Sequence, residues 1–276
     1  MKRYLISWVL MLVLLASCGG SKSGAKGDAD DSLQADSSEV DIVQEALDEA
    51  TLPRAADELF DDFFFNFAAV HKLQMERIKF PLTVISEDKE GVITKERWKM
   101  ERFFMPQGYY TLLFDSEQNM EVVKDTSVCH AVVERISFDQ QRIRQFIFNR
   151  PVGAWMMTEI RDIPMEKSHN ATFLAFYHRF ATDTHYQQKH LSGAVKFVGP
   201  DPDDDFNQME GIITPDTWEA FAPELPSGTI YNIVYGKPEK EGRQKVFVLR
   251  GISNGMELEM TFHKKGSEWK LSKLTT

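Results

Sequence analysis

The sequence predicts an α+β protein made of two tandem units, each an N-terminal helix followed by antiparallel strands. The phrase GVITKERW (91–98) recurs as GIITPDTW (211–218), 120 residues later. An aromatic helical pattern precedes each phrase, and alternating strand-like runs follow it. The same order of elements is therefore expected twice, over residues 53–164 and 165–276.

Each unit begins with a helix that carries one aromatic face. The first helix is expected to start near Pro53, which suits a first turn, and to run to about His71. Its apolar face is expected to pack into the core. The same residue classes return 113 positions later: Phe60, Phe63, Phe64 and Phe67 correspond to Phe173, Phe176, Tyr177 and Phe180.

The strands are predicted from period-two alternation. In the run 256–263 the apolar residues alternate with Glu257, Glu259 and Thr261, so one side of the sheet is expected to be buried and the other wet. Asn254-Gly255 is a typical two-residue hairpin turn. Strands are expected at 109–114, 127–138, 141–148 and 153–160 in the first unit, and at 229–235, 244–252 and 256–263 in the second.

The arrangement resembles the nuclear-transport-factor-2-like superfamily. Phe80-Pro81-Leu82, then Gly91-Val92-Ile93-Thr94 and Trp98, resembles the phrase between helix and sheet in its bacterial members, whereas the second unit has Leu191-Ser192-Gly193 instead of Phe-Pro-Leu. The resemblance implies two cone-shaped domains, each with a helix inside a strongly curved antiparallel sheet. It also extends to uncharacterised lipoproteins of Gram-negative gut bacteria, and it implies no particular activity.

The N-terminus predicts export and lipidation. Lys2 and Arg3 precede an apolar run, and Leu15-Ala16-Ser17-Cys18 resembles the lipobox of bacterial lipoproteins. Residues 1–17 are then a signal peptide, and Cys18 is the lipid attachment site. Gly19 in place of Asp favours an outer-membrane anchor, on the periplasmic side or at the cell surface.

Residues 18–52 are expected to form an acidic flexible tether. Residues 18–51 hold nine acidic residues and two lysines, a net charge of −7 within a chain of −10 overall. This distribution argues against nucleic-acid binding, which requires a concentrated basic face. The expected partners are the membrane, through Cys18, and an unknown small molecule or envelope protein.

Arg142 and Arg144 are candidate ligand-binding residues. The register that aligns Phe148 with Phe262 aligns them with apolar residues of the second unit, so they would face the cone interior and need carboxylates, solvent or an anionic ligand. In the alternative register Ile143 and Ile147 face inward and the arginines face solvent.

Ketosteroid isomerase and scytalone dehydratase share the fold of this superfamily, so the resemblance makes acid–base chemistry a second candidate function. Such a site needs a carboxylate or His beside a polar donor in a dry pocket. Parts could come from Tyr109, Tyr110, His130, Glu134 and Tyr231, of which Tyr110 and His130 are also candidate ligand-binding residues. These residues match no enzyme motif, so we predict no catalytic residue and no cofactor.

Two patterns resemble metal-ligand spacings but depart from them. The insertion containing Asp201, Asp203, Asp204 and Asp205 has alternating oxygen ligands, but Phe206 takes the place of the glycine that a calcium loop requires. His178, His185 and His190 lack a further ligand at zinc spacing. We therefore predict no metal site, with calcium at the acidic loop left open.

The sequence thus favours a lipid-anchored envelope protein that binds a small molecule or partner protein through its cone pockets, without catalysis. The alternatives are an isomerase- or dehydratase-like enzyme that uses one pocket, and a purely structural module in which Ile143 and Ile147 pack against the other unit.

Overall fold

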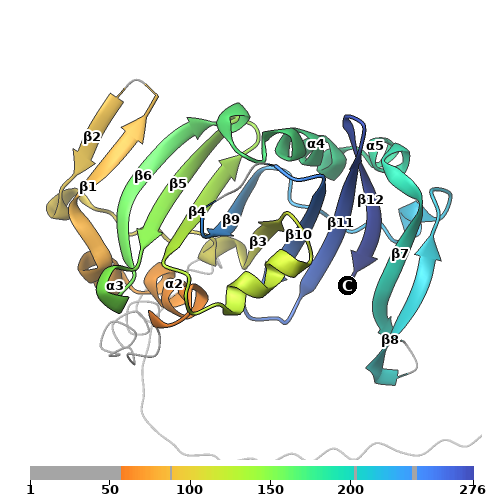
Figure 1. Cartoon of the computed structure of the whole chain (residues 1–276), viewed down its shortest axis with the longest axis horizontal. Helices are drawn as coiled ribbons and strands as arrows, with labels where there is room; N and C mark the ends of the chain where they lie inside the picture. Colours follow the sequence, from red (N-terminus) through yellow and green to blue (C-terminus); the bar gives the residue numbers. More distant parts are fainter. Residues whose placement is uncertain (1–56, 88, 202–203, 238–240) are drawn as a thin grey trace, which may run out of the picture.

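The computed structural model describes residues 57–276 except 88, 202–203 and 238–240. Cys18, the signal peptide and the tether lie outside the described residues. The described residues form a single twisted sheet of 12 strands with helices on both faces (Figure 1). The strand order is β2-β1-β6-β5-β4-β9-β3-β10-β11-β12-β7-β8.

The order of two helices and six strands occurs twice along the chain. The first half (57–164) contains α2 (Phe60–Ala69), α3 (His71–Arg77), β1 (Ile78–Ser86), β2 (Lys89–Ile93), β3 (Tyr109–Phe114), β4 (His130–Ser137), β5 (Arg142–Asn149) and β6 (Met156–Pro164). The second half (165–276) contains α4 (Ala171–Thr182), α5 (Thr184–Lys189), β7 (Leu191–Asp201), β8 (Asp204–Ile213), β9 (Thr229–Tyr235), β10 (Gln244–Gly251), β11 (Glu257–Lys265) and β12 (Glu268–Thr275).

The sheet differs from the predicted pair of separate antiparallel sheets. Strand β9 of the second half pairs with β4, and β3 of the first half pairs with β10. Because β3 and β9 each pair only with strands of the other half, we call them the exchanged strands. The exchanged strands are parallel neighbours in the middle of the sheet. Parallel pairs also join β1 to β6 and β7 to β12. A purely antiparallel sheet was therefore a wrong prediction, because period-two alternation says nothing about which strand is the neighbour.

The predicted helices and turns are mostly present, with local differences. The first helix is broken at Val70, whose extended backbone ends α2 and precedes α3. The short turns that carry Trp98 and Trp218 are 3-10 turns. Gly255 has a φ of 67° in the predicted hairpin turn. Met256, expected on the buried face, is exposed because it precedes the first paired residue of β11.

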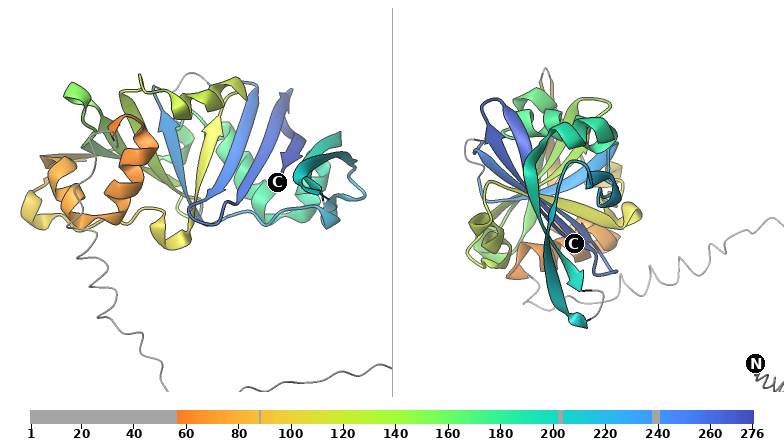
Figure 2. Two further views of the ribbon diagram at one scale, coloured as in Figure 1. Left: turned by 90° about the horizontal axis from the view of Figure 1, so that it is seen from below. Right: turned by 90° about the vertical axis from the view of Figure 1, so that its right-hand side faces the viewer.

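Each face of the sheet carries its own hydrophobic core. Helix α2 packs on one face and α4 on the other (Figure 2). Val246 and Val248 of β10 belong to the core around α2, whereas Phe247 and Leu249 belong to the core around α4. The central strands are thus buried on both sides, and the expected wet face is absent there.

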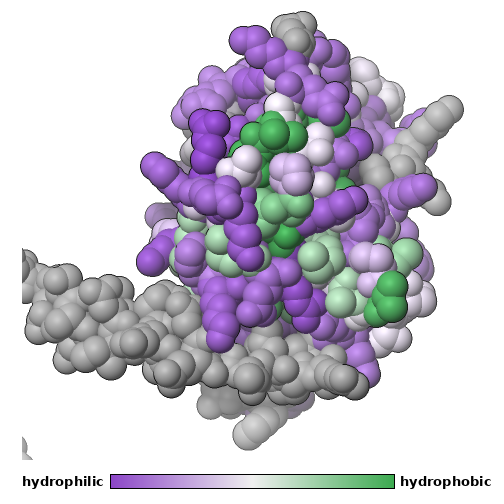
Figure 3. All heavy atoms as spheres, turned by 90° about the vertical axis from the view of Figure 1, so that its left-hand side faces the viewer, coloured by the Kyte–Doolittle hydropathy of each residue, from purple (hydrophilic) through white to green (hydrophobic). Residues whose placement is uncertain are grey.

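The two outer strands, β2 and β8, end the sheet. Seen from the β2 end, the surface is largely hydrophilic with a smaller apolar area (Figure 3). Val92 of β2 is among the exposed apolar residues. No helix in the described part of the chain is long and apolar enough to span a bilayer.

Candidate functional site

An arginine-lined pocket opens on the α2 face of the sheet, beyond the aromatic core. It has a volume of about 200 Å³. Strands β4 and β5 contribute its three arginines, and β1, β6 and the turn between β4 and β5 complete the wall. The lining residues are Ser86, Arg135, Ser137, Gln140, Arg142, Arg144 and Asp162.

Strand alternation places the arginines beside the core. Arg142 and Arg144 share a face of β5 with Phe146 and Phe148, which belong to the core around α2. This is the face on which the alignment of Phe148 with Phe262 places the two arginines. Ile143 is buried nevertheless, because the opposite face of β5 is covered by the core around α4. The two registers considered from the sequence are therefore not exclusive: this strand is covered on both sides.

Arg144 is held by the strongest contact in the pocket. Its Nε and Nη2 each donate to a carboxylate oxygen of Asp162 at 2.7 Å, a bidentate arrangement. The hydrogen bond to Asp162 raises the pKa of Arg144. Its Nη1 donates to no group among the described residues, so one edge of the guanidinium remains available.

The other two arginines have looser partners. Arg135 lies 3.6 Å from a carboxylate oxygen of Glu101, and Arg142 lies 3.7 Å from one of Glu87. Lys167 donates to the other oxygen of Glu87 at 2.7 Å. All these side chains are partly exposed, and exposed ion pairs are weak. A bound anion could therefore replace the carboxylates beside Arg135 and Arg142.

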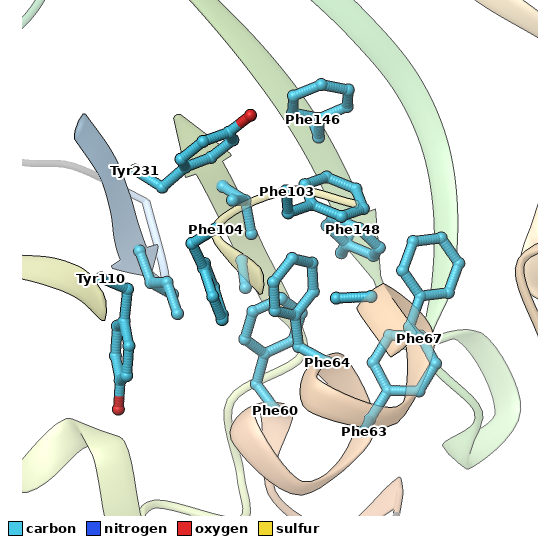
Figure 4. Packing of buried hydrophobic residues seen from close by; sticks show 14 of the residues in the cluster. Phe60, Phe63, Phe64, Phe67, Phe103, Phe104, Tyr110, Phe146, Phe148 and Tyr231 are labelled. Carbon is cyan, nitrogen blue, oxygen red and sulfur yellow. The ribbon is translucent and has the colours of Figure 1, made fainter. Parts of the chain in front are cut away.

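Tyr231 brings the second half of the chain next to this pocket, although it does not line it. It lies on the exchanged strand β9 (Figure 4), where it is the cross-strand partner of Arg135 on β4. Burial raises the pKa of Tyr231, and the charge of Glu101 raises it further, while Arg135 acts in the opposite direction. The phenol is therefore a neutral hydrogen-bonding group at pH 7.

Aromatic rings fill the interior below the pocket. Phe64 and Phe67 contact Phe148 edge to face at 5.4 and 5.2 Å between ring centroids, and Phe103 contacts Phe146 at 4.9 Å (Figure 4). Edge-to-face contacts between rings stabilise the core by more than the burial of apolar surface area accounts for. The rings occupy the interior in which a small molecule was expected.

The structure separates the other candidate residues. Tyr110 is buried on β3, its ring stacks on Phe104, and burial raises its pKa. His130 lies at the start of β4, where its Nδ1 is 2.8 Å from Oδ1 of Asn149. Strand β9 lies between β3 and β4, so these two residues do not meet. Glu134 is buried on β4 and accepts hydrogen bonds from Gln145 and Asn232.

A carboxylate–tyrosine pair was missed from the sequence. The hydroxyl of Tyr235 on β9 donates to Asp61 on α2, across the two halves. Burial raises the pKa of both groups, far above the usual value for Tyr235. The only sequence signal was an acid next to the aromatic face of the helix, and its partner is 174 residues away.

The metal hypotheses find no support among the described residues. No group of three or more His, Cys, Asp or Glu side chains there could hold a metal ion. His178 stacks on Phe138, with 5.0 Å between ring centroids. Asp203 of the acidic loop lies outside the described residues, so the calcium question concerns a segment that is described only in part.

Comparisons with known proteins identify the family but no activity. The family described as "Domain of unknown function (DUF4348)" matches residues 39–276. No curated protein matches the chain. A crystal structure of an NTF2-like protein from Bacteroides fragilis NCTC 9343 is 38% identical, with a TM-score of 0.73, over 82% of this chain and 98% of that one. The chain therefore belongs to the DUF4348 family and to the nuclear-transport-factor-2-like (NTF2-like) superfamily.

Proposed function

We propose that this protein is a lipid-anchored component of the bacterial cell envelope that binds a small anion, a carboxylate or a phosphate, without chemical conversion. The arginine-lined pocket carries the proposal. Asp162 fixes Arg144 through Nε and Nη2, so the Nη1 edge is held in place with no partner among the described residues. Planar, fixed guanidinium groups suit carboxylate and phosphate oxygens.

The remaining groups of the pocket also suit an anion. Arg135 and Arg142 lie on the same face as Arg144, and Ser137 adds a hydroxyl. Their present partners, Glu101 and Glu87, are partly exposed and are held at 3.6 and 3.7 Å. An anion that displaces these carboxylates would gain charge-assisted hydrogen bonds while both acids move into water.

Calorimetric titration of the protein with inorganic phosphate and with succinate tests the proposal. We expect saturable binding that weakens as ionic strength rises. Arg142→Ala combined with Arg144→Ala should lower the affinity by about tenfold or more. Arg161→Ala is the matched control, because Arg161 is exposed on the opposite face of β6. Equal affinity in the double variant and the wild type would exclude this pocket.

The anchor requires its own test. Cys18 follows Leu15-Ala16-Ser17 at the end of the apolar segment, and the acidic tether would separate the folded part from the membrane. In a Gram-negative host, Cys18→Ser should abolish incorporation of a labelled fatty acid and release the protein from the membrane fraction. Continued labelling of this variant would contradict lipidation at Cys18.

We also propose that residues 53–164 and 165–276 are two copies of one cone-shaped unit that have exchanged a strand. The recurring order of helices and strands supports this interpretation. So does a repeated pair of side chains: the indole of Trp98 donates to Gln74, and that of Trp218 donates to Gln187. If the protein binds a partner protein and not a small anion, titration with inorganic phosphate and with succinate should give no heat of binding.

A further inference from the structure

A crevice separates the two exchanged strands in the middle of the sheet. Strands β3 and β9 are paired only at Thr111–Asn232 and Leu112–Ile233, although β3 continues to Phe114 and β9 to Tyr235. Beyond the last pair the strands diverge around a crevice of about 270 Å³. It lies at the carboxyl ends of two parallel strands where the chain order changes, and such places bind ligands in open α/β sheets.

The crevice combines apolar walls with an acidic and a basic group. Phe114, Val122 and Ile233 contribute apolar surface, and Asp115, His169 and Lys237 contribute polar atoms. Ligand sites typically show this combination of an apolar lining and a few converging polar groups.

Asp115 is fixed in place with one oxygen available. Its Oδ1 accepts from Nζ of Lys245 at 2.5 Å and from the backbone N–H of Gly242 at 3.1 Å. Its Oδ2 accepts no hydrogen bond from the described residues. The Lys245 side chain is fully buried, whereas 33% of the Asp115 side chain remains exposed. The free carboxylate oxygen is therefore an acceptor open to a cationic group.

His169 offers a donor on the same crevice. The Oδ1 of Asn170 accepts from Lys245, which orients the amide so that its Nδ2 points to Nε2 of His169, 2.8 Å away. The imidazole therefore accepts at Nε2 and carries its proton on Nδ1. Burial lowers the pKa of His169, so the ring is neutral at pH 7. Its Nδ1–H has no acceptor among the described residues.

Lys237 provides the positive charge. It lies two residues after the end of β9 and is exposed, so its ammonium group can reach over the opening without a desolvation penalty. Asp115, His169 and Lys237 thus place a fixed acceptor, a neutral donor and an exposed cation around one crevice.

We propose that this crevice binds a small zwitterion with an apolar side chain, as in a free apolar amino acid. The ligand's ammonium group would donate to Oδ2 of Asp115, and its carboxylate would accept from Lys237 and from Nδ1–H of His169. Its side chain would lie against Phe114, Val122 and Ile233. This site is separate from the arginine-lined pocket and shares no lining residue with it.

Titration of the full chain with L-leucine tests the proposal. The control probes are 4-methylpentanoate, which lacks only the ammonium group, and 3-methylbutylamine, which lacks only the carboxylate. Leucine should bind saturably, and each truncated probe should bind about tenfold more weakly or worse. Failure of leucine to bind at millimolar concentration would overturn the proposal. Equal binding of the amine would overturn the assignment of a zwitterion.

Two variants locate the site without breaking the buried pair of Asp115 and Lys245. Lys237→Ala removes the exposed cation, and Val122→Trp fills the crevice from its wall; each should lower leucine affinity by about tenfold. The double variant Arg142→Ala, Arg144→Ala should bind leucine normally, which separates this site from the anion pocket. Undiminished leucine binding by Val122→Trp would place the ligand elsewhere and refute the proposal.

Discussion

The indole Nε1 of Trp218 donates a 2.9 Å hydrogen bond to Oε1 of Gln187, which is buried at the end of α5. Nε2 of the same amide donates to the carbonyl oxygen of Phe180 at 2.8 Å. The first half repeats this geometry: Trp98 donates to Gln74 at 3.1 Å, and Gln74 donates to Phe67 at 2.9 Å. The recurring tryptophan therefore fastens a 3-10 turn to the helices, which is a structural role.

Gln187→Leu should destabilise the protein by roughly 2–4 kcal/mol, because it leaves the buried indole N–H and a buried carbonyl without partners. Unfolding in urea at pH 7 measures the change. Gln188→Leu is the control at the next residue, which is partly exposed, and it should change the free energy of unfolding by less than about 0.5 kcal/mol. Similar costs at the two positions would contradict this role for Gln187.

Asp115 and Lys245 should respond unequally to substitution, although they form one ion pair. Asp115→Ala leaves a fully buried ammonium group without its carboxylate and should cost about 3–5 kcal/mol. Lys245→Met leaves a carboxylate that is one-third exposed and keeps the Gly242 hydrogen bond, so about 1–2 kcal/mol is expected. A larger loss for Lys245→Met, measured by urea unfolding, would show that Asp115 is the less well solvated partner.

Much of the fold was predictable from local pattern. The aromatic faces of the helices and the runs 109–114 and 229–235 were located correctly, because periodicity reports which residues are buried. The strand exchange was not predictable. Pairing of β4 with β9 brings Glu134 beside Asn232, and no period or turn signal in the sequence distinguishes this neighbour from β3.

Within the candidate site, the sequence grouped only residues that lie on the same strand. Comparison of the halves singled out Arg142 and Arg144 but left two registers open for them, and it connected neither Asp162 nor Arg135 to them. Tyr235 and Asp61 come together only through the exchanged strand. Contacts between distant segments depend on topology, which the sequence pattern left open.

The strand exchange predicts that the halves do not fold independently. Both sheet neighbours of β3, β9 and β10, come from the second half, so residues 53–164 alone would leave the apolar side chains of β3 without sheet partners. The protein should unfold in one cooperative transition, seen identically by tryptophan fluorescence and far-UV circular dichroism. Each half expressed alone should be unfolded or aggregated. Two separate transitions in the intact chain would contradict this expectation.

Glu87→Gln should increase the affinity of the arginine-lined pocket for inorganic phosphate by roughly two- to fivefold, because it removes a carboxylate that competes for Arg142 and Lys167. The gain should be largest at low ionic strength. Glu121→Gln is the control: Glu121 forms an exposed pair with Lys124 and does not line the pocket. An equal gain in both variants would indicate a general charge effect.

Asp61 should make the stability of the protein depend on pH. Burial raises the pKa of its carboxyl in the folded state, although the hydrogen bond from Tyr235 opposes this change. Folding therefore favours the protonated form. The stabilisation is fully present below the pKa of an unfolded aspartate, about 3.9, and it is lost as the pH rises through the higher pKa of the folded state.

Asp61→Asn removes this titration and keeps an acceptor for the Tyr235 hydroxyl. The free energy of unfolding of the variant relative to the wild type should therefore increase from pH 4 to pH 7, with a plateau once Asp61 is ionised in the folded protein. Urea unfolding at several pH values measures the difference. Asp62→Asn is the control, because Asp62 is the exposed neighbour on the same helix. A difference that decreases from pH 4 to pH 7 would mean that the hydrogen bond from Tyr235 outweighs burial, and that Asp61 is stabilised as the anion.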